Sequence, residues 1–216
     1  MSCWEGGPEA AAELAVQICT ETRRLFCNVL EVDSNQLHVC LKLLVEVDGE
    51  QKVATWARSE PFDDRPAEQG SDNAHAIEKN SVWCALLGRK DATRSWRVFD
   101  CFCCNDLPSQ TNFHCDRPSW SRYYKSTLVF PIRYVVDRGS NLVEALGFLA
   151  IDSPNTNAFT GVPNIFDYVD QPQQYRDKLE SSAWFHMGGL IVDTIGAVLR
   201  GAHSKRVTGE RGNDAA

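Results

Sequence analysis

The sequence lacks a long apolar run, an excess of positive charge and a regular spacing of cysteines. No stretch approaches the roughly 18 consecutive apolar residues that a membrane-spanning helix requires. The net charge is −7, with scattered lysine and arginine, which argues against a surface for nucleic acid or for an anionic membrane. The N-terminus, MSCWEGGPEAAAE, has no basic region ahead of an apolar stretch, unlike a secretory signal peptide. We therefore expect a cytoplasmic protein with no nucleic-acid or membrane partner.

Cysteine is plentiful but does not form the pattern of a disulfide framework. The chain has nine cysteines, an odd number at irregular spacing, in a chain long enough to form its own core. Cys19, Cys27 and Cys40 fall within apolar periodic segments, where free cysteine behaves as a small buried hydrophobe. The 216 residues are 43% hydrophobic and 10% aromatic, which suits one domain with a sizeable core.

Residues 126–153 predict the centre of the fold. Two apolar runs, 127–136 and 142–151, flank a turn-forming segment, as in an antiparallel hairpin. Strands that are apolar on both faces are covered on both sides of their sheet. Pro131 cannot donate a ladder hydrogen bond and Gly147 has no side chain, so we expect a bulge or a close backbone approach there.

The other segments predict helices at both ends of the chain and more strands between them. Apolar residues at three- and four-residue steps predict helices over 8–30, over 77–87 with Gly88 as the C-cap, and over 173–199. Alternating apolar residues predict strands over 36–47 and 51–58, joined by a turn at Asp48-Gly49, and over 94–100. We expect one domain over 8–200, a flexible leader over 1–7 and a disordered tail over 201–216.

This order of elements predicts an α+β fold, because consecutive hairpins are combined with helices at both ends. Three short segments then resemble the GAF domain, the small-molecule-sensing relative of the PAS fold. They are STLVFPI at 126–132, LGFLAID at 146–152 and NAF at 157–159. The segment 103–107 is also similar to the part of that family that follows the third strand. The resemblance implies a central antiparallel sheet of about five to six strands, flanked by the N- and C-terminal helices.

The resemblance also implies a function. It is that of a sensor or regulatory module, rather than an enzyme, which binds a small molecule and signals through its terminal helices to a partner protein. The Asn-Lys-Phe-Asp-Glu motif of cyclic-nucleotide-binding members is absent from the sequence, which argues against that ligand.

In the GAF fold the pocket lies between the central sheet and the connection that corresponds here to 101–125. Small-molecule sites are concave, with aromatic walls and a few polar groups. The expected ligand-contacting residues are Trp96, Phe99, Asp100, Asn112, Phe113, Trp120, Arg122, Tyr123 and Tyr124. These aromatic residues are equally well explained as a cover that closes the core beneath a loop.

Three alternatives concern the cysteine-rich segment. Cys101, Cys103, Cys104, His114 and Cys115 are of types that bind zinc, although their spacing differs from the paired C-x2-C of a zinc finger or ribbon. Stand-alone GAF proteins that reduce free methionine sulfoxide use two cysteines around this pocket, and Cys84 and Cys115 occupy loosely similar places. The chain would then be a thiol-redox enzyme, which requires a lowered thiol pKa.

A bilin-attachment site at His114-Cys115 is a weaker interpretation, because the order of the two residues is the reverse of that found at such sites. A degenerate GAF domain that survives as an interaction subunit is the remaining alternative.

The terminal helices also predict an assembly. The segment 173–199 is apolar around most of its circumference, and such a helix is usually buried on more than one side. Gly188, Gly189 and Gly196 would let a neighbouring helix approach closely. GAF domains commonly pair through their terminal helices. We therefore expect a homodimer, or a helical contact with a partner protein, through 8–30 and 173–199.

Overall fold

A computed structural model describes residues 8–59, 74–137, 142–159 and 161–210, with only the backbone described for 8, 9, 34, 135–137, 142 and 201–210. Six strands form one antiparallel sheet in the order β3-β2-β1-β6-β5-β4. The strands are β1 (His38–Val47), β2 (Glu50–Arg58), β3 (His75–Ala76), β4 (Phe102–Cys104), β5 (Ser126–Asp137) and β6 (Leu142–Ser153). The sheet is therefore built of hairpins, and the hairpin β5–β6 lies next to β1 near its middle, as predicted.

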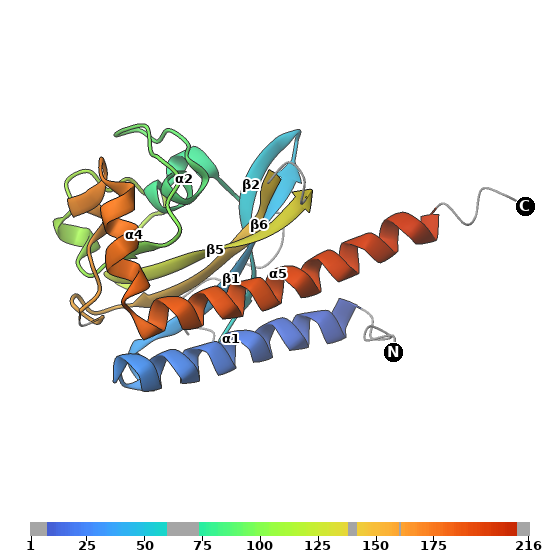
Figure 1. Cartoon of the computed structure of the whole chain (residues 1–216), viewed down its shortest axis with the longest axis horizontal. Coiled ribbons are helices and arrows are strands. Elements are labelled where there is room, and N and C mark those ends of the chain that lie inside the picture. Colours follow the sequence, from blue (N-terminus) through green and yellow to red (C-terminus); the bar gives the residue numbers. More distant parts are fainter. Residues whose placement is uncertain (1–7, 60–73, 138–141, 160, 211–216) are drawn as a thin grey trace, which may run out of the picture.

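The helices are α1 (Pro8–Leu30), α2 (Ser81–Leu87), α3 (Trp120–Tyr123), α4 (Pro172–Glu180) and α5 (Ala183–Glu210). The long helices α1 and α5 run antiparallel, side by side, along one face of the sheet (Figure 1). Helix α1 packs on β1 and β2, and α5 packs mainly on β5. Helix α2 and the connections around it lie on the other side of the sheet (Figure 1). The predicted α+β architecture is confirmed.

Local turn chemistry behaves as the sequence indicates. Asp48 and Gly49 both have positive φ, 57° and 76°, as the two-residue turn of a β1–β2 hairpin requires. Gly88 ends α2 in the left-handed conformation, with its N–H bonded to the carbonyl of Cys84.

The centre of the sheet is tightly packed around Gly147. A Cβ on Gly147 would lie 2.1 Å from the carbonyl oxygen of Lys42 on the neighbouring strand β1. The register between β5 and β6 shifts beside this glycine, since Ile132 pairs with Gly147 whereas Arg133 pairs with Ala145. The predicted bulge and close backbone approach are both present here.

Residues of the GAF-like segments hold the core together. The Asn105 side chain donates to the carbonyl of Phe159 at 2.6 Å and accepts from its N–H at 2.8 Å. The Ser126 hydroxyl lies 2.7 Å from the carbonyl oxygens of both Asn105 and Asn155, and its single proton can be donated to either. Phe159 is fully buried. These positions therefore fix a loop against the sheet, a structural role.

Two predicted elements differ in the structure. Residues 94–100 form no strand beyond an isolated bridge at Ser95. The Asp91 carboxylate accepts from the N–H of Arg94 and from the indole of Trp96, which bends the chain just before this stretch and holds Trp96 in the core. The predicted helix 173–199 is two helices, bent by 98° at a break after Glu180. The second of them continues to Glu210, past the predicted end of the helix and into the predicted tail, since no proline interrupts it. Residues 1–7 and 211–216 lie outside the described residues.

The glycines of α5 have a different role from the predicted one. A Cβ on Gly188 would lie 2.3 Å from the ring of Phe130 on β5, and one on Gly196 would lie 2.9 Å from the carbonyl oxygen of Arg133. Both glycines therefore let α5 approach the protein's own sheet. A Cβ on Gly189 would meet no atom within 4 Å, so this position faces away from the sheet.

Within the described part of the chain, no single helix is long and apolar enough to cross a membrane. The bent pair of α4 and α5 meets that test of length and composition when taken together.

Candidate ligand-binding cavity

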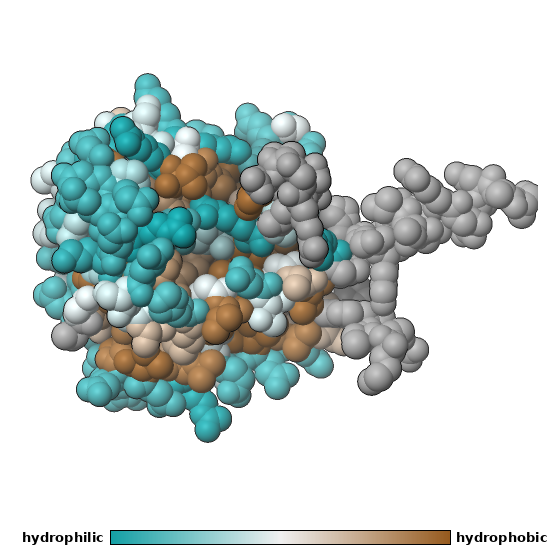
Figure 2. Space-filling view, viewed as in Figure 1, coloured by the Kyte–Doolittle hydropathy of each residue, from teal (hydrophilic) through white to brown (hydrophobic). Residues whose placement is uncertain are grey.

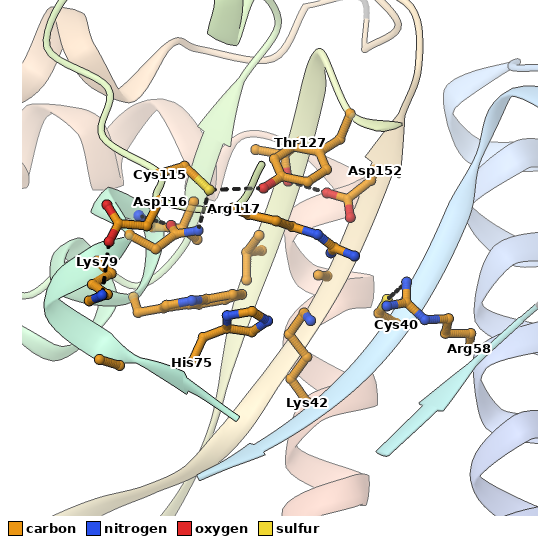
Figure 3. A pocket seen from close by; sticks show the side chains of 17 residues that line it. Cys40, Lys42, Arg58, His75, Lys79, Cys115, Asp116, Arg117, Thr127 and Asp152 are labelled. Atoms are coloured by element: carbon orange, nitrogen blue, oxygen red, sulfur yellow. Dashed lines mark hydrogen bonds and ion pairs between the residues drawn. The ribbon is translucent and has the colours of Figure 1, made fainter. Parts of the chain in front are cut away.

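A cavity of about 70 Å³ lies on the face of the sheet opposite α1 and α5. Side chains alternate between the two faces of a strand, so Thr127 and Val129 of β5 face the cavity whereas Phe130 faces α5. From the other central strands, Cys40, Lys42, Ala150 and Asp152 line it. The far wall is made by β3, α2 and the segment 115–117, together with Tyr124 (Figure 3).

The far wall is held by pairing between the start of α2 and the segment that follows His114. Asn80 forms a β-bridge with Cys115, and the N–H of Asp116 bonds to the carbonyl of Lys79 at 3.0 Å. The Asn80 carboxamide caps α2 by accepting from the N–H of Val82 at 2.8 Å and donates to the sulfur of Cys115 at 3.4 Å. This pairing carries the next residue, Arg117, over the cavity.

Asp91 organises the support behind this wall. Its carboxylate accepts hydrogen bonds from the Ser81 hydroxyl at 2.5 Å, the indole N–H of Trp96 at 2.8 Å and the N–H of Thr93 at 2.7 Å. The same Ser81 hydroxyl accepts from the N–H of His114 at 2.9 Å. Burial by itself would raise the pKa of Asp91, but these hydrogen bonds lower it to about 2. A buried carboxylate thus ties α2 to the loops on either side.

Positive charge predominates in the cavity lining. The basic residues are Lys42, Arg58, His75, Lys79 and Arg117, and the described acidic residues are Asp116 and Asp152. At the mouth, Lys79 forms an ion pair with Asp116 at 3.1 Å. On the sheet, Asp152 accepts a hydrogen bond from the Thr127 hydroxyl at 2.6 Å.

Lys42 is the most unusual of these groups, because it stands in a central strand of the sheet. Its ammonium group donates to the Thr55 hydroxyl at 2.9 Å and lies 5.8 Å from the centroid of the Trp83 ring. Burial lowers the pKa of Lys42, and the guanidinium groups of Arg58 and Arg117 lower it further. The side chains of Lys42 and Arg117 extend toward the same space (Figure 3).

Of the nine predicted ligand-contacting residues, Tyr124 lines this cavity. Phe113 and Trp120 form a layer behind it, with ring centroids 4.8 Å apart, and Trp120 packs in turn on Tyr124 at 5.7 Å. Asn112 and Arg122 are exposed, and Tyr123 is half-buried beside Arg117. Trp96 and Phe99 are buried in the core, where their rings meet edge-on.

Asp100, the last of the nine, belongs to a second hollow, of about 270 Å³, against α4. There it forms ion pairs with Arg133 at 3.2 Å and with Arg176 at 3.6 Å. These ion pairs already engage the charged groups around this hollow. The cavity above Lys42 is therefore the better candidate site.

The five predicted zinc ligands do not converge. The sulfurs of Cys101 and Cys103 lie 3.3 Å apart, as expected for neighbours on one face of a strand, whereas Cys115 sits in the cavity wall. His114 instead contacts Asp116 at 3.0 Å. Among the described residues, no group of three or more His, Cys, Asp and Glu side chains is arranged to hold a metal ion.

The two cysteines of the redox alternative are poor nucleophiles. Burial raises the pKa of Cys84 to about 12, and its sulfur donates to the carbonyl of Ile77 at 3.4 Å. Burial also raises the pKa of Cys115, whose sulfur lies 3.2 Å from the Tyr124 hydroxyl. A catalytic thiol needs a lowered pKa, so the structure does not favour thiol chemistry here.

Most of the cavity residues were missed by the sequence interpretation, which concentrated on 96–124. One signal was present: Lys42 interrupts the apolar run 39–45 of a strand that is hydrogen-bonded on both sides. Lysine is rarely buried without a partner, and a lysine in such a strand marks a polar site. Arg58, Arg117 and Asp152 have no comparable local signal.

No family model matches the sequence, and no curated protein matches it. Solved structures do match. A far-red cyanobacteriochrome photoreceptor aligns with a TM-score of 0.51 and 11% identity over 89% of this chain and 90% of the other. A phycocyanobilin-bound GAF domain from a cyanobacterial phytochrome aligns at 0.44 and 14% identity, over 94% and 98% of the two chains. The chain has a GAF fold.

A type II free methionine-R-sulfoxide reductase from Thermoplasma acidophilum also matches, with a TM-score of 0.46 and 18% identity over 86% of this chain and 92% of the other. Identities this low concern the fold and not the chemistry.

Proposed function

We propose that the protein is a sensor module that binds a small molecule in the cavity above Lys42 and signals through α1 and α5. The observation that carries the proposal is the position of the cavity: its floor is the same central sheet whose other face supports both helices. Only one layer of strands separates a bound ligand from the proposed output.

Strand β5 connects the two faces directly. Val129 lines the cavity, and its neighbour Phe130 packs on the other face against Trp184 of α5 at 6.2 Å and Phe26 of α1 at 6.0 Å. The ring of Phe130 lies in the space left by Gly188. Because Phe130 packs closely against the backbone of α5, a ligand that displaces β5 also displaces α5. A ligand can shift the helices only by as much as it prefers one arrangement over the other.

The output surface proposed here is the outward face of the helix pair, which pairs with a second copy of the chain. Large apolar side chains are exposed on both helices, including Leu25 and Val29 of α1 at 45% and 43%, and Leu190 of α5 at 70%. A shallow apolar groove also runs between the helices at Leu14 and Val198. Apolar surface follows the pair in Figure 2. Contiguous exposed apolar surface is typical of protein interfaces.

We also propose that the protein works in the cytoplasm. All eight described cysteines are free thiols, which suits a reducing compartment.

Native mass spectrometry of protein purified without reductant or chelator tests the sensor proposal. We expect a small added mass, and slower amide hydrogen exchange in both β5 and α5 when the ligand is present than when it has been removed. A ligand that protects the cavity wall but leaves α5 unchanged would refute signalling through the helices. Absence of any ligand, together with no thermal shift from a metabolite library, would favour the degenerate interaction subunit.

Light scattering at micromolar concentration tests the assembly. We expect a dimer for the wild type and a monomer for Leu190→Arg, because a charge would be buried in the interface. Asp170→Arg, an exposed position outside both helices, is a control for the change of charge. A wild-type monomer would exclude self-association and leave a partner protein as the occupant of this face.

A further inference from the structure

The cavity is basic within an acidic protein. The chain carries a net charge of −7, yet four lysine or arginine residues and one histidine line this one space against two described acids. Asp116 is paired with Lys79 and His114, and the Asp152 carboxylate, which accepts from the Thr127 hydroxyl, offsets part of the charge of the other three cations. The lining therefore has a local excess of positive charge.

Three of these cations come from separate parts of the chain and approach one another. Lys42 stands on β1, Arg58 ends β2, and Arg117 reaches across from the opposite wall (Figure 3). Like charges brought together repel, and the single Asp152 carboxylate in the same lining offsets only part of the charge of three cations. A lysine ammonium has three donors, and one of those of Lys42 is directed at the neutral hydroxyl of Thr55.

We propose that the cavity binds the anionic group, a carboxylate or a phosphate, of a small organic ligand, and that Lys42, Arg58 and Arg117 receive it. This proposal rests on the proposed sensor function and names the class of its ligand. Guanidinium groups bind both kinds of oxyanion through paired hydrogen bonds, and an ammonium group adds a point charge.

The receiving groups are held in place before a ligand arrives. One guanidinium nitrogen of Arg58 donates to the sulfur of Cys40 at 3.3 Å. The guanidinium carbon of Arg117 lies 5.6 Å from the centroid of the Tyr123 ring, and the pairing of 114–117 with α2 fixes its backbone. Cations positioned in this way lose little side-chain entropy on binding.

The size of the cavity limits the ligand. About 70 Å³ is enclosed, whereas sites for drug-sized molecules occupy roughly 300–1,000 Å³. The space therefore suits an anionic head group or a ligand of very few atoms. Val129, Ala150 and the indole of Trp83 form the apolar part of the lining, so an uncharged portion of the ligand would lie against them.

Isothermal titration calorimetry at low ionic strength, with inorganic phosphate, succinate and the neutral analogue succinamide as probes, tests the proposal. The variants are Lys42→Met and Arg117→Gln, with the exposed Arg97→Gln, away from the cavity, as the matched control. Loss of one charge-assisted hydrogen bond weakens binding by about tenfold or more. We expect that loss in both cavity variants, full affinity in the control, and at least tenfold weaker binding of succinamide than of succinate.

The two anionic probes distinguish a phosphate ligand from a carboxylate ligand. Equal binding of succinate and succinamide, or anion binding unchanged in both cavity variants, would overturn the proposal. Circular dichroism of each variant shows that a loss is not caused by unfolding. Binding of succinamide alone, or a neutral ligand that co-purifies, would overturn the anion assignment but leave the sensor function standing. If no probe binds and nothing co-purifies, both proposals fail.

Discussion

The same substitution, glycine to alanine, should have opposite effects at Gly147 and Gly189. At Gly147 the new Cβ would lie 2.1 Å from the carbonyl oxygen of Lys42 and 3.0 Å from the Cα of Leu43. Both contacts are with backbone, so no side chain can rotate away. Because the two strands are hydrogen-bonded along their length, relief of the clash requires them to separate by about 1 Å, which exceeds the tolerance of a close-packed interior.

Overpacking of a core costs about 1–3 kcal/mol and sometimes more. We expect Gly147→Ala to lower the free energy of unfolding by about 3 kcal/mol, the upper end of this range, because the new Cβ would clash with backbone atoms that cannot move aside. A domain of this size loses roughly 2–4 °C in Tm per kcal/mol, so its Tm should fall by about 6–12 °C. Gly189 lies inside a helix with nothing within 4 Å, and there alanine should add about 0.5–1 kcal/mol of stability.

Differential scanning calorimetry of the two variants, with urea unfolding as a second measure, checks both values. The clash involves the backbone of Lys42, so Gly147→Ala should also weaken binding of an anion in the cavity. A Tm within about 2 °C of the wild type for Gly147→Ala would refute the close approach at the centre of the sheet. A lower Tm for Gly189→Ala, together with loss of a dimer, would show that this glycine meets a helix of another molecule.

Three further predictions follow from buried groups. Phe148 is fully buried with its ring 4.7 Å from that of Trp83, so Phe148→Asp should abolish cooperative thermal unfolding; a normal melt would contradict its central position. The pKa of the Asp91 carboxyl is lowered from 3.8 to about 2, so the ionised carboxylate stabilises the fold above pH 3.8 and this contribution is lost as the pH falls toward 2. Asp91→Asn should therefore make the free energy of unfolding, measured with urea, depend less on pH between 4 and 2. Burial raises the pKa of Cys19 from 9.0 to about 12, so the stability that its protonated thiol contributes is complete below pH 9 and falls by about 1.4 kcal/mol per pH unit above it. Cys19→Ala should lessen this alkaline slope, and an unchanged slope would refute the assignment.

Features that depend on neighbouring residues could be predicted from the sequence. Helix α1 begins and ends where the apolar period does, at Pro8 and Leu30. The Asp48-Gly49 turn and the Gly88 cap need only residues that tolerate positive φ. The hairpin at 126–153 is recognised by its apolar strands, since only a central hairpin buries both faces. Because these signals are local, they can be recognised without knowledge of the tertiary structure.

Predictions failed where a specific side-chain contact or the tertiary packing overrides the apolar period. Residues 94–100 alternate as a strand does, but the carboxylate of Asp91 binds the N–H of Arg94 and the indole of Trp96 and so directs the start of this stretch away from the sheet ladder. The apolar period of 173–199 continues through the 98° bend after Glu180, because each half packs its own apolar side. The sequence assigns Gly188 to a helix–helix contact, but the ring that fills its space belongs to β5.

The sequence by itself determined the α+β class, the central hairpin and the GAF-like segments, through periodicity and turn chemistry. Only the tertiary structure decided the cavity. Lys42, Arg58 and Arg117 meet because β2 lies beside β1 in the sheet order and because 114–117 pairs with the start of α2. The first pairing is a hairpin that the sequence also predicts. The second joins residues far apart in the chain, and no local pattern encodes which distant loop will close over the strands. The charge that marks this cavity therefore became visible only when the chain was folded.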